Sequence, residues 1–330
     1  MTKKSKKAII ALSILLAFLI GLGIFLCVWF FGAKYPAFDH LAQREEALPA
    51  LTDGFCPQGA CALPRNDGGY TAAVSGYYKP GVPSRVYLLG EGKEPAFVTV
   101  EKDGKLLDAH FGGVAATEKY LYITNDTEIV RLALEDVYEA AGAGGKAAVI
   151  DSFETGIPEI AFCAVSGDLF FVGEFYRKGN YETDKTHHVT QNGETNRALV
   201  YCYKMNEDNP HGMASITTPY AVLSVRGLVQ GIAVREDYIV LSCSWGLADS
   251  KLYWYSNPLG GASEFSSTPR FFLGEDSLLG TLTAPCMSEG IFVREDRVNI
   301  LFESGANKYK HFVRRRTTAL YSVPLSAYEK

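Results

Sequence analysis

Polar residues recur in this sequence at the starts of apolar, strand-like segments. Five such segments align on Gln58, Gly112, Glu159, Gln230 and Glu289, and each is followed by mainly apolar or small residues. Carboxylate and amide oxygens are the ligands that Ca²⁺ prefers, so Glu159, Glu289 and Asn125 form a candidate calcium site. Carboxylates that meet at one point must otherwise be protonated or paired with cations. The alternative is that Glu159 and Glu289 bond backbone amides and hold strands together.

A second group of residues is suited to proton transfer or ligand contact. His110 is the only histidine beside one of these strand starts, so it is the candidate general base if the protein is a hydrolase. A solvent-facing loop histidine is the alternative, and we expect His187 and His188 to be exposed in a polar insertion. Aromatic side chains can stack on a sugar or another planar ligand. The candidate ligand-binding set is Gln58, Tyr77, Glu174, Gln230, Trp245, Glu303 and Lys308.

These residues need a scaffold of repeated strands to bring them together. After a short polar turn, each first strand is followed by a second, namely "YTAAVSGYY", "YLYITND", "LFFVGEFY", "YIVLSCSW" and "VNILFES". Third strands follow, and the candidate fourth strands are "AFVTVE", "AAVIDSF", "YAVLSV" and "RFFLGE". A unit of four antiparallel strands repeated at this spacing is typical of a β-propeller blade.

The repeat predicts an all-β, five-bladed β-propeller. Six blades are the alternative, because the 71-residue interval between Glu159 and Gln230 has room for a degenerate blade. The last unit lacks a fourth strand, and the short apolar segment "ALPALT" at residues 47–52 is expected to supply it and close the ring. In a propeller the first strand of each blade lines the channel, so the aligned polar residues should meet at one channel mouth.

The strand starts "QGIA" and "EGI", with their polar turns and second strands, resemble bacterial exported propellers of the broad gluconolactonase, NHL-like and surface-repeat superfamily. The resemblance covers Gln58 to Leu325. The chain is also distantly similar to the calcium-activated nucleotidases. This similarity implies a five-bladed fold and a site in the central channel, and members of that family can carry an N-terminal membrane anchor.

The N-terminus has the pattern of a membrane anchor. A basic tail over residues 1–7 precedes an uncharged apolar run over residues 8–33, and an apolar helix of that length can cross a bilayer. Four lysines before the run place the N-terminus in the cytoplasm and the rest of the chain outside. A cleaved signal peptide is the alternative, although its apolar region is usually shorter. We expect a linker over residues 34–46 and the propeller over residues 47–330.

Charge and cysteine usage narrow the functional classes. The formal net charge is −5 although four lysines lie at the N-terminus, so nucleic acid is not expected as a partner. Six of the seven cysteines follow the apolar run, where a disulfide between Cys56 and Cys286 would clamp the ring. A Cys56–Cys61 pair and free thiols are the alternatives. No zinc, P-loop or nucleophile-elbow motif is present.

Two functions are consistent with these features. The first is a membrane-anchored extracytoplasmic protein that binds a protein, glycan or small molecule at the channel mouth. The second is a calcium-dependent hydrolase of a phosphoester, lactone or glycan, with Glu159 and Glu289 holding the ion and His110 moving a proton. Calcium is the one cofactor that the residues suggest.

Overall fold

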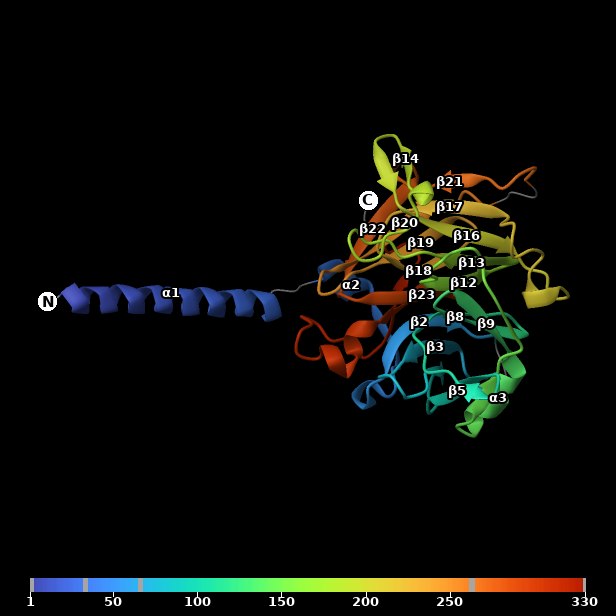
Figure 1. Ribbon diagram of the computed structural model, residues 1–330, viewed down its shortest axis with the longest axis horizontal. Coiled ribbons are helices and arrows are strands. Elements are labelled where there is room, and N and C mark those ends of the chain that lie inside the picture. The colour runs from blue at the N-terminus through green and yellow to red at the C-terminus, as the bar shows by residue number, and fades with distance from the viewer. Residues whose placement is uncertain (1–2, 32–34, 65–67, 261–264, 329–330) are drawn as a thin grey trace.

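The computed structural model describes residues 3–31, 35–64, 68–260 and 265–328, and their main body is a five-bladed β-propeller (Figure 1). The predicted fold class is therefore confirmed. Each blade is an antiparallel sheet of four strands that run in sequence order from the channel outward, except in the closing blade. The five innermost strands contact one another in turn around the central axis.

The blades follow the predicted repeat. Blade 1 comprises β2 (Cys56–Ala62), β3 (Ala72–Tyr77), β4 (Arg85–Leu89) and β5 (Ala96–Lys102). Blade 2 comprises β7 (Phe111–Ala116), β8 (Tyr120–Asn125), β9 (Glu128–Ala133) and β11 (Asp151–Phe153). Blade 3 comprises β12 (Phe162–Ser166), β13 (Leu169–Gly173), β16 (Ala198–Lys204) and β17 (Ala221–Val225). Blade 4 comprises β18 (Val229–Val234), β19 (Tyr238–Cys243), β20 (Ser250–Ser256) and β22 (Leu278–Ala284). Blade 5 comprises β23 (Ser288–Arg294), β24 (Arg297–Phe302), β25 (Ala319–Pro324) and β1 (Gln43–Ala47).

Apolar clusters between neighbouring blades hold the ring together. One cluster lies at each of the five blade junctions, which is why most strands are apolar on both faces. Between blades 4 and 5, for example, Trp254 packs with Ile300 and Phe302. The burial of large side chains at every junction makes each blade depend on both of its neighbours.

The ring closes through the N-terminal segment, as expected, but with different residues. Strand β1 pairs antiparallel with β25 and completes blade 5, so closure occurs at Gln43–Ala47 instead of residues 47–52. The expected strand was misplaced because Leu48 and Leu51 are buried in the cluster between blades 5 and 1. Ala50 adopts a positive φ of 54°, which turns the chain inward.

The predicted linker over residues 34–46 is also partly folded. Helix α2 (Pro36–Leu41) follows the apolar helix, and Phe38 is fully buried against Phe302 and Tyr321. The packed part of the chain therefore begins before residue 47. A single buried aromatic residue in a short polar segment gives too weak a pattern to predict a docked helix.

Two of the predicted fourth strands are placed differently. "RFFLGE" contains β21 (Arg270–Phe272), which pairs parallel with β17 of blade 3, and β22 is the fourth strand of blade 4. "AAVIDSF" divides between β11 and β10 (Lys146–Ala148), and β10 pairs parallel with β5 of blade 1. Blades 1 and 3 thus each gain an extra outer strand from the following blade's connection. A short strand does not reveal by its own composition which neighbouring edge it will join.

The remaining elements lie outside the four-stranded units. Helix α3 (Leu134–Gly142) covers blades 1 and 2, and β6 (Lys105–Leu106) extends β5 as a short hairpin. The insertion in blade 3 forms a hairpin of β14 (Val189–Gln191) and β15 (Glu194–Asn196). Short 3₁₀ helices are η1 (Leu51–Asp53), η2 (Lys185–His187), η3 (Pro210–Gly212), η4 (Glu275–Ser277), η5 (Glu303–Gly305) and η6 (Asn307–Tyr309). The insertion adds no sixth blade.

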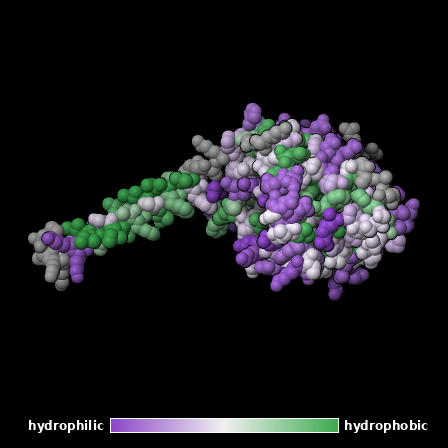
Figure 2. Space-filling view, turned by 90° about the horizontal axis from the view of Figure 1, so that it is seen from above, coloured by the Kyte–Doolittle hydropathy of each residue, from purple (hydrophilic) through white to green (hydrophobic). Residues whose placement is uncertain are grey.

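Helix α1 (Lys3–Phe31) is the one described helix that is long and apolar enough to cross a membrane. Its large apolar side chains between Ile9 and Val28 are 41–67 % exposed, and Figure 2 shows them as a hydrophobic rod beside a largely polar body. A signal sequence near the N-terminus has the same features. The helix is therefore an apolar segment that is consistent with either an anchor or a signal sequence.

Candidate ligand site at the channel mouth

The aligned polar residues mark a repeated irregularity in the inner strands. Strands β2, β7, β18 and β23 each shift register against their neighbour at the residue that the sequence aligned: Gln58, Gly112, Gln230 and Glu289. Such a β-bulge bends the strand and redirects a side chain. The face on which the inner strands begin and the second strands end is called the mouth face below.

The glycine after each bulge allows the inner strands to touch. A Cβ atom on Gly59 would lie 2.4 Å from the carbonyl oxygen of Gly112, and one on Gly290 would lie 2.5 Å from the amide nitrogen of Ala60. Gly231 is similarly close to the backbone of Glu289. The "QG" and "EG" pairs thus reflect close backbone packing around the axis. This packing narrows the channel at its mouth.

Glu159 does not belong to this set of bulges. Strand β12 begins at Phe162 and pairs with β13 without a register shift. A Cβ atom on Gly113 would meet the amide nitrogen of Cys163 at 2.3 Å, so the residues beside Gly113 are 162 and 163. Glu159 is exposed in the preceding loop. The aligned "PEI" resembles "QGI" in pattern, but the strand starts later because this junction lacks the bulge.

Glu289 lies buried at the centre of the mouth. It is only 5 % exposed, and its carboxyl oxygen Oε1 accepts a hydrogen bond from Gln230 Nε2 at 3.4 Å. Burial, reinforced by the nearby negative charge of Glu303, raises the pKa of Glu289 well above its ordinary value, although Lys308 opposes the shift. Burial therefore favours the neutral form of this carboxyl. A neutral carboxyl removes the charge repulsion that is expected where several carboxylates meet.

Residues from blades 1 and 5 meet beside Glu289 in a connected group, the Lys308 cluster: Cys56, Tyr77, Glu303, Lys308 and Tyr309. Glu303 Oε1 accepts from the Cys56 thiol at 2.8 Å and from the Tyr309 hydroxyl at 2.9 Å, and it lies 3.2 Å from Lys308 Nζ. Lys308 also donates to the Tyr77 hydroxyl at 2.6 Å.

The charge state of the Lys308 cluster follows from these contacts. Partial burial acts to lower the pKa of Lys308, but Glu303 and the Tyr77 hydroxyl outweigh it, so the pKa is raised. Burial and the charge of Glu303 raise the pKa of the Cys56 thiol. The cluster therefore presents a stable ammonium and a neutral thiol. The side chain of Lys308 is 43 % exposed and can still reach a ligand.

The other predicted mouth residues of blades 1 and 2 lie next to this cluster. Gln58 Nε2 donates to the Pro57 carbonyl at 2.9 Å and approaches the Cys56 sulfur at 3.9 Å. The ring of His110 lies over Tyr77, with 4.2 Å between centroids. Asn125 Nδ2 donates to Glu128 Oε1 at 3.0 Å, which ties its amide to a neighbouring turn.

Glu174 and Trp245 form a second group, at blades 3 and 4. Glu174 is 3 % exposed and accepts from His187 Nδ1 at 2.7 Å and from the amide of Leu199 at 2.8 Å. Burial raises its pKa, although both partners oppose the shift. Glu174 is thus occupied by protein groups, and His187, predicted to be exposed, is the partner that sequence reasoning missed. An adjacent His pair in a polar insertion carries no signal of such a contact.

Trp245 lies in an aromatic patch with a half-buried cation. Its ring contacts Phe175 and Tyr181 at centroid distances of 5.8 and 5.7 Å, and the Arg177 guanidinium lies 4.2 Å from its centroid. Cation–π contact of this kind orients the guanidinium over the ring. The mouth face therefore carries aromatic rings and cations on two sides.

Beyond the mouth, the channel is a small cavity. It has a volume of about 280 Å³ and is lined by the inner strands of all five blades, with small residues such as Ala60, Ala116, Ala164 and Ala233. Ser166, Arg235 and Glu295 add polar side chains to this lining.

The residues present do not fit a calcium ion. Among the described residues, no three His, Cys, Asp or Glu side chains come together as a metal site. Glu159 is exposed in the loop before β12, and the ammonium of Lys308 lies beside Glu303, although the Oδ1 oxygen of Asn125 is buried without a hydrogen-bond partner in the described part of the chain. A calcium ion bound beside Glu303 would be repelled by the positive charge of the Lys308 ammonium, or would have to displace it.

The expected clamp between Cys56 and Cys286 is absent, and both thiols are free. Cys56 bonds Glu303, whereas Cys286 is buried with Met287 and Val313. Cys61, the alternative partner of Cys56, is free as well. The six cysteines beyond α1 are all buried, and each packs as an apolar side chain or bonds locally.

Comparison with known proteins gives no family. No protein-family model matches the chain, and no curated protein matches it. Among solved structures, the glutaminyl cyclase of Myxococcus xanthus is 11 % identical, with a TM-score of 0.47, and the match covers 86 % of this chain and 95 % of that one. The PQQ-bound aldose sugar dehydrogenase of Streptomyces coelicolor is 13 % identical, with a TM-score of 0.45 and coverage of 86 % and 97 %. These similarities are too low to carry an activity over to this protein.

Proposed function

We propose that this protein is a membrane-anchored, extracytoplasmic binding protein whose propeller holds a carbohydrate ligand at the channel mouth. The observation that carries the proposal is the Lys308 cluster, in which a cation, a carboxylate and two phenols from blades 1 and 5 converge beside Gln58 and Glu289. Sugars are recognised by such mixed donors and acceptors together with aromatic faces, which Tyr77 and Trp245 provide.

The anchor part of the proposal is supported by α1 and its surroundings. The guanidinium of Arg314, in the loop between β24 and β25, lies 4.0 Å from the ring centroid of Trp29 near the end of α1. Tryptophan is enriched where membrane helices leave the hydrocarbon region. The same loop carries Lys308 and Tyr309, so the proposed site lies on the side of the propeller that faces the anchor.

The ligand can be tested with purified full-length protein in detergent micelles on an array of defined neutral and acidic oligosaccharides. We expect selective binding that falls at least tenfold on Lys308→Met and on Trp245→Ala. Lys105→Met, at an exposed position of β6, is the matched control and should bind as the wild type does. Binding to no oligosaccharide, or equal binding by all variants, would refute the proposal.

A hydrolase is the second candidate, and one observation favours it. Burial and the nearby charge of Glu303 raise the pKa of Glu289, and two carboxyl groups in such different environments are suited to acid and base roles. His110 is the candidate base of such a hydrolase, and the calcium that the resemblance to the nucleotidases implies has no fitting site among the described residues. Hydrolysis of p-nitrophenyl phosphate, p-nitrophenyl glycosides and gluconolactone should be measured with and without calcium. Turnover that disappears in Glu289→Gln would favour the enzyme, and no turnover of any substrate would exclude these reactions.

A further inference from the structure

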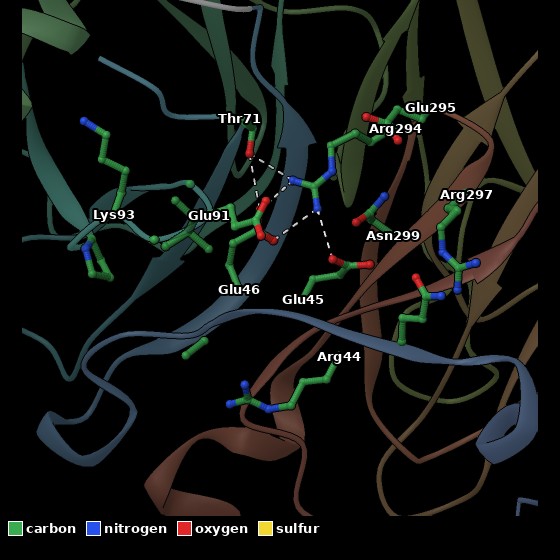
Figure 3. Close-up of a pocket in the computed structure, with 16 residues that line it drawn as sticks. Arg44, Glu45, Glu46, Thr71, Glu91, Lys93, Arg294, Glu295, Arg297 and Asn299 are labelled. Carbon is green, nitrogen blue, oxygen red and sulfur yellow. Dashed lines mark hydrogen bonds and ion pairs between the residues drawn. The ribbon is translucent and has the colours of Figure 1, made fainter.

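A polar cleft separates blades 5 and 1 on the face opposite the channel mouth. Its volume is about 630 Å³, and it is lined by strand β1, the β23–β24 turn, part of β24 and the loop between β4 and β5 (Figure 3). The cleft is distinct from the proposed carbohydrate site and lies where the apolar contacts between the two blades give way to charged residues. It contains no aromatic lining residue.

Two of the four cations that line the cleft, Arg294 and Arg297, are bonded to the protein. Arg294 Nη1 lies 2.6 Å from Glu46 and also donates to Thr71 at 3.0 Å, and its Nη2 lies 3.7 Å from Glu45. Burial acts to raise the pKa of Glu46, but Arg294 outweighs it and the pKa is lowered, so this pair is charged. Arg297 donates to the Leu41 carbonyl. Figure 3 shows the side chains of Arg44 and Lys93 apart from the group formed by Arg294, Glu45 and Glu46.

One acceptor in the cleft is left without a partner. Asn299, on β24, is only 1 % exposed, and its buried carbonyl oxygen Oδ1 has no hydrogen-bond partner among the described residues. A buried acceptor without a partner costs free energy, so it marks a place where a donor can bind. Glu45 lies in the same lining, where its carboxylate is 3.7 Å from Arg294 and accepts a hydrogen bond from the Ser322 hydroxyl. The group of Glu45, Glu46 and Arg294 therefore has one more carboxylate than guanidinium, within a lining of four acidic and four basic residues.

We propose that this cleft binds a primary ammonium group, with Asn299 Oδ1 as the central acceptor and Glu45 as the counter-charge. A charged N–H donor would satisfy Asn299 and gain a charge-assisted bond from the carboxylate. The ammonium can come from a free alkylamine or from a lysine side chain of a peptide. Both present the same chemistry to the cleft.

The test uses full-length protein in detergent micelles, titrated calorimetrically at low salt with two probes. Cadaverine represents a free amine, and N-acetyl-lysine methylamide represents a peptide lysine. The key variant is Asn299→Leu, which keeps the shape of the side chain and removes its polar atoms. We expect this variant to bind about tenfold more weakly than the wild type, and Glu45→Gln to weaken binding similarly. Glu135→Gln, at an exposed position of α3, changes the net charge equally and should have no effect.

Thermal melting without a probe separates a binding role from a structural one. Because Asn299 Oδ1 is unpaired, we expect Asn299→Leu to melt at the same temperature as the wild type or higher, while its affinity falls. Binding of either probe that requires Asn299 supports the proposal and identifies the source of the amine. Binding of neither probe, or equal binding by the wild type and Asn299→Leu, would overturn it, and so would a lower melting temperature of that variant, which indicates a structural asparagine.

Discussion

At the scale of single residues, Glu289 shows how the fold decides the state of a functional group. Its carboxyl is enclosed by the inner strands and approached by one amide, so it keeps its proton where an exposed glutamate would not. Glu174 is also buried, but it is bonded to His187 and a backbone amide. The same residue type thus serves the mouth in blade 5 and the protein framework in blade 3.

The raised pKa of Glu289 makes stability depend on pH. Between the ordinary value of 4.5 and its raised folded pKa, the carboxyl is protonated when folded and ionised when unfolded, so the free energy of unfolding falls as pH rises through this window. Glu289→Gln removes this dependence. Relative to the wild type, we expect the variant to gain roughly 1–3 kcal/mol between pH 5 and pH 8.

Urea denaturation at the two pH values measures this difference. Glu118→Gln, at an exposed turn, is the control and should shift stability equally at both pH values. If Glu289→Gln also differs from the wild type by the same amount at pH 5 and pH 8, the buried carboxyl does not hold its proton.

At the scale of elements, strand β1 joins the two ends of the ring. It supplies the fourth strand of blade 5, and through Glu46 it contacts Arg294 of blade 5 and Thr71 of blade 1. The parallel strands β10 and β21 show a related arrangement. Strand β10 lies between strands of blade 2 in the sequence but pairs with blade 1, and β21 lies between strands of blade 4 but pairs with blade 3. Outer strands therefore tie the blades together across sequence boundaries.

Replacing Gln43–Ala47 with a glycine–serine segment of equal length should open the ring. The edge of β25 would lose its partner and the Glu46–Arg294 pair would break, and we expect the melting temperature to fall by roughly 10 °C or more. An equivalent replacement of the exposed residues 310–312 should change it by no more than a few degrees. Equal melting temperatures for both variants would show that β1 is not needed for closure.

At the scale of the whole molecule, the proposed role of α1 as an anchor can be tested directly. If it is an anchor, the mature protein keeps residues 1–33 and remains with the membrane fraction. We expect mass spectrometry of the protein from washed membranes to find the intact N-terminus, and external protease to digest the propeller but not the basic tail. A mature N-terminus near Lys34 in the soluble fraction would show that α1 is a signal peptide.

The sequence by itself determined the repeating unit and the apolar N-terminal segment, and it favoured five blades over six. Strand alternation and the "QG" and "EG" pairs are visible locally, because they involve residues that are neighbours in the sequence. The same pairs marked Gln58, Gln230 and Glu289 as positions where the inner strands shift register. Glu159 was misplaced because one blade omits the bulge.

Only the tertiary structure decided which of these groups act together. Cys56 and Glu303 are separated by 247 residues and meet because the ring closes, and His187 reaches Glu174 because the insertion folds back over blade 3. The unpaired oxygen of Asn299 likewise depends on how two blades at opposite ends of the chain diverge. Such contacts depend on how whole sheets pack against one another, and the residue pattern of a single strand does not encode this packing. The alternation that defines each blade, by contrast, lies within the sequence of that blade.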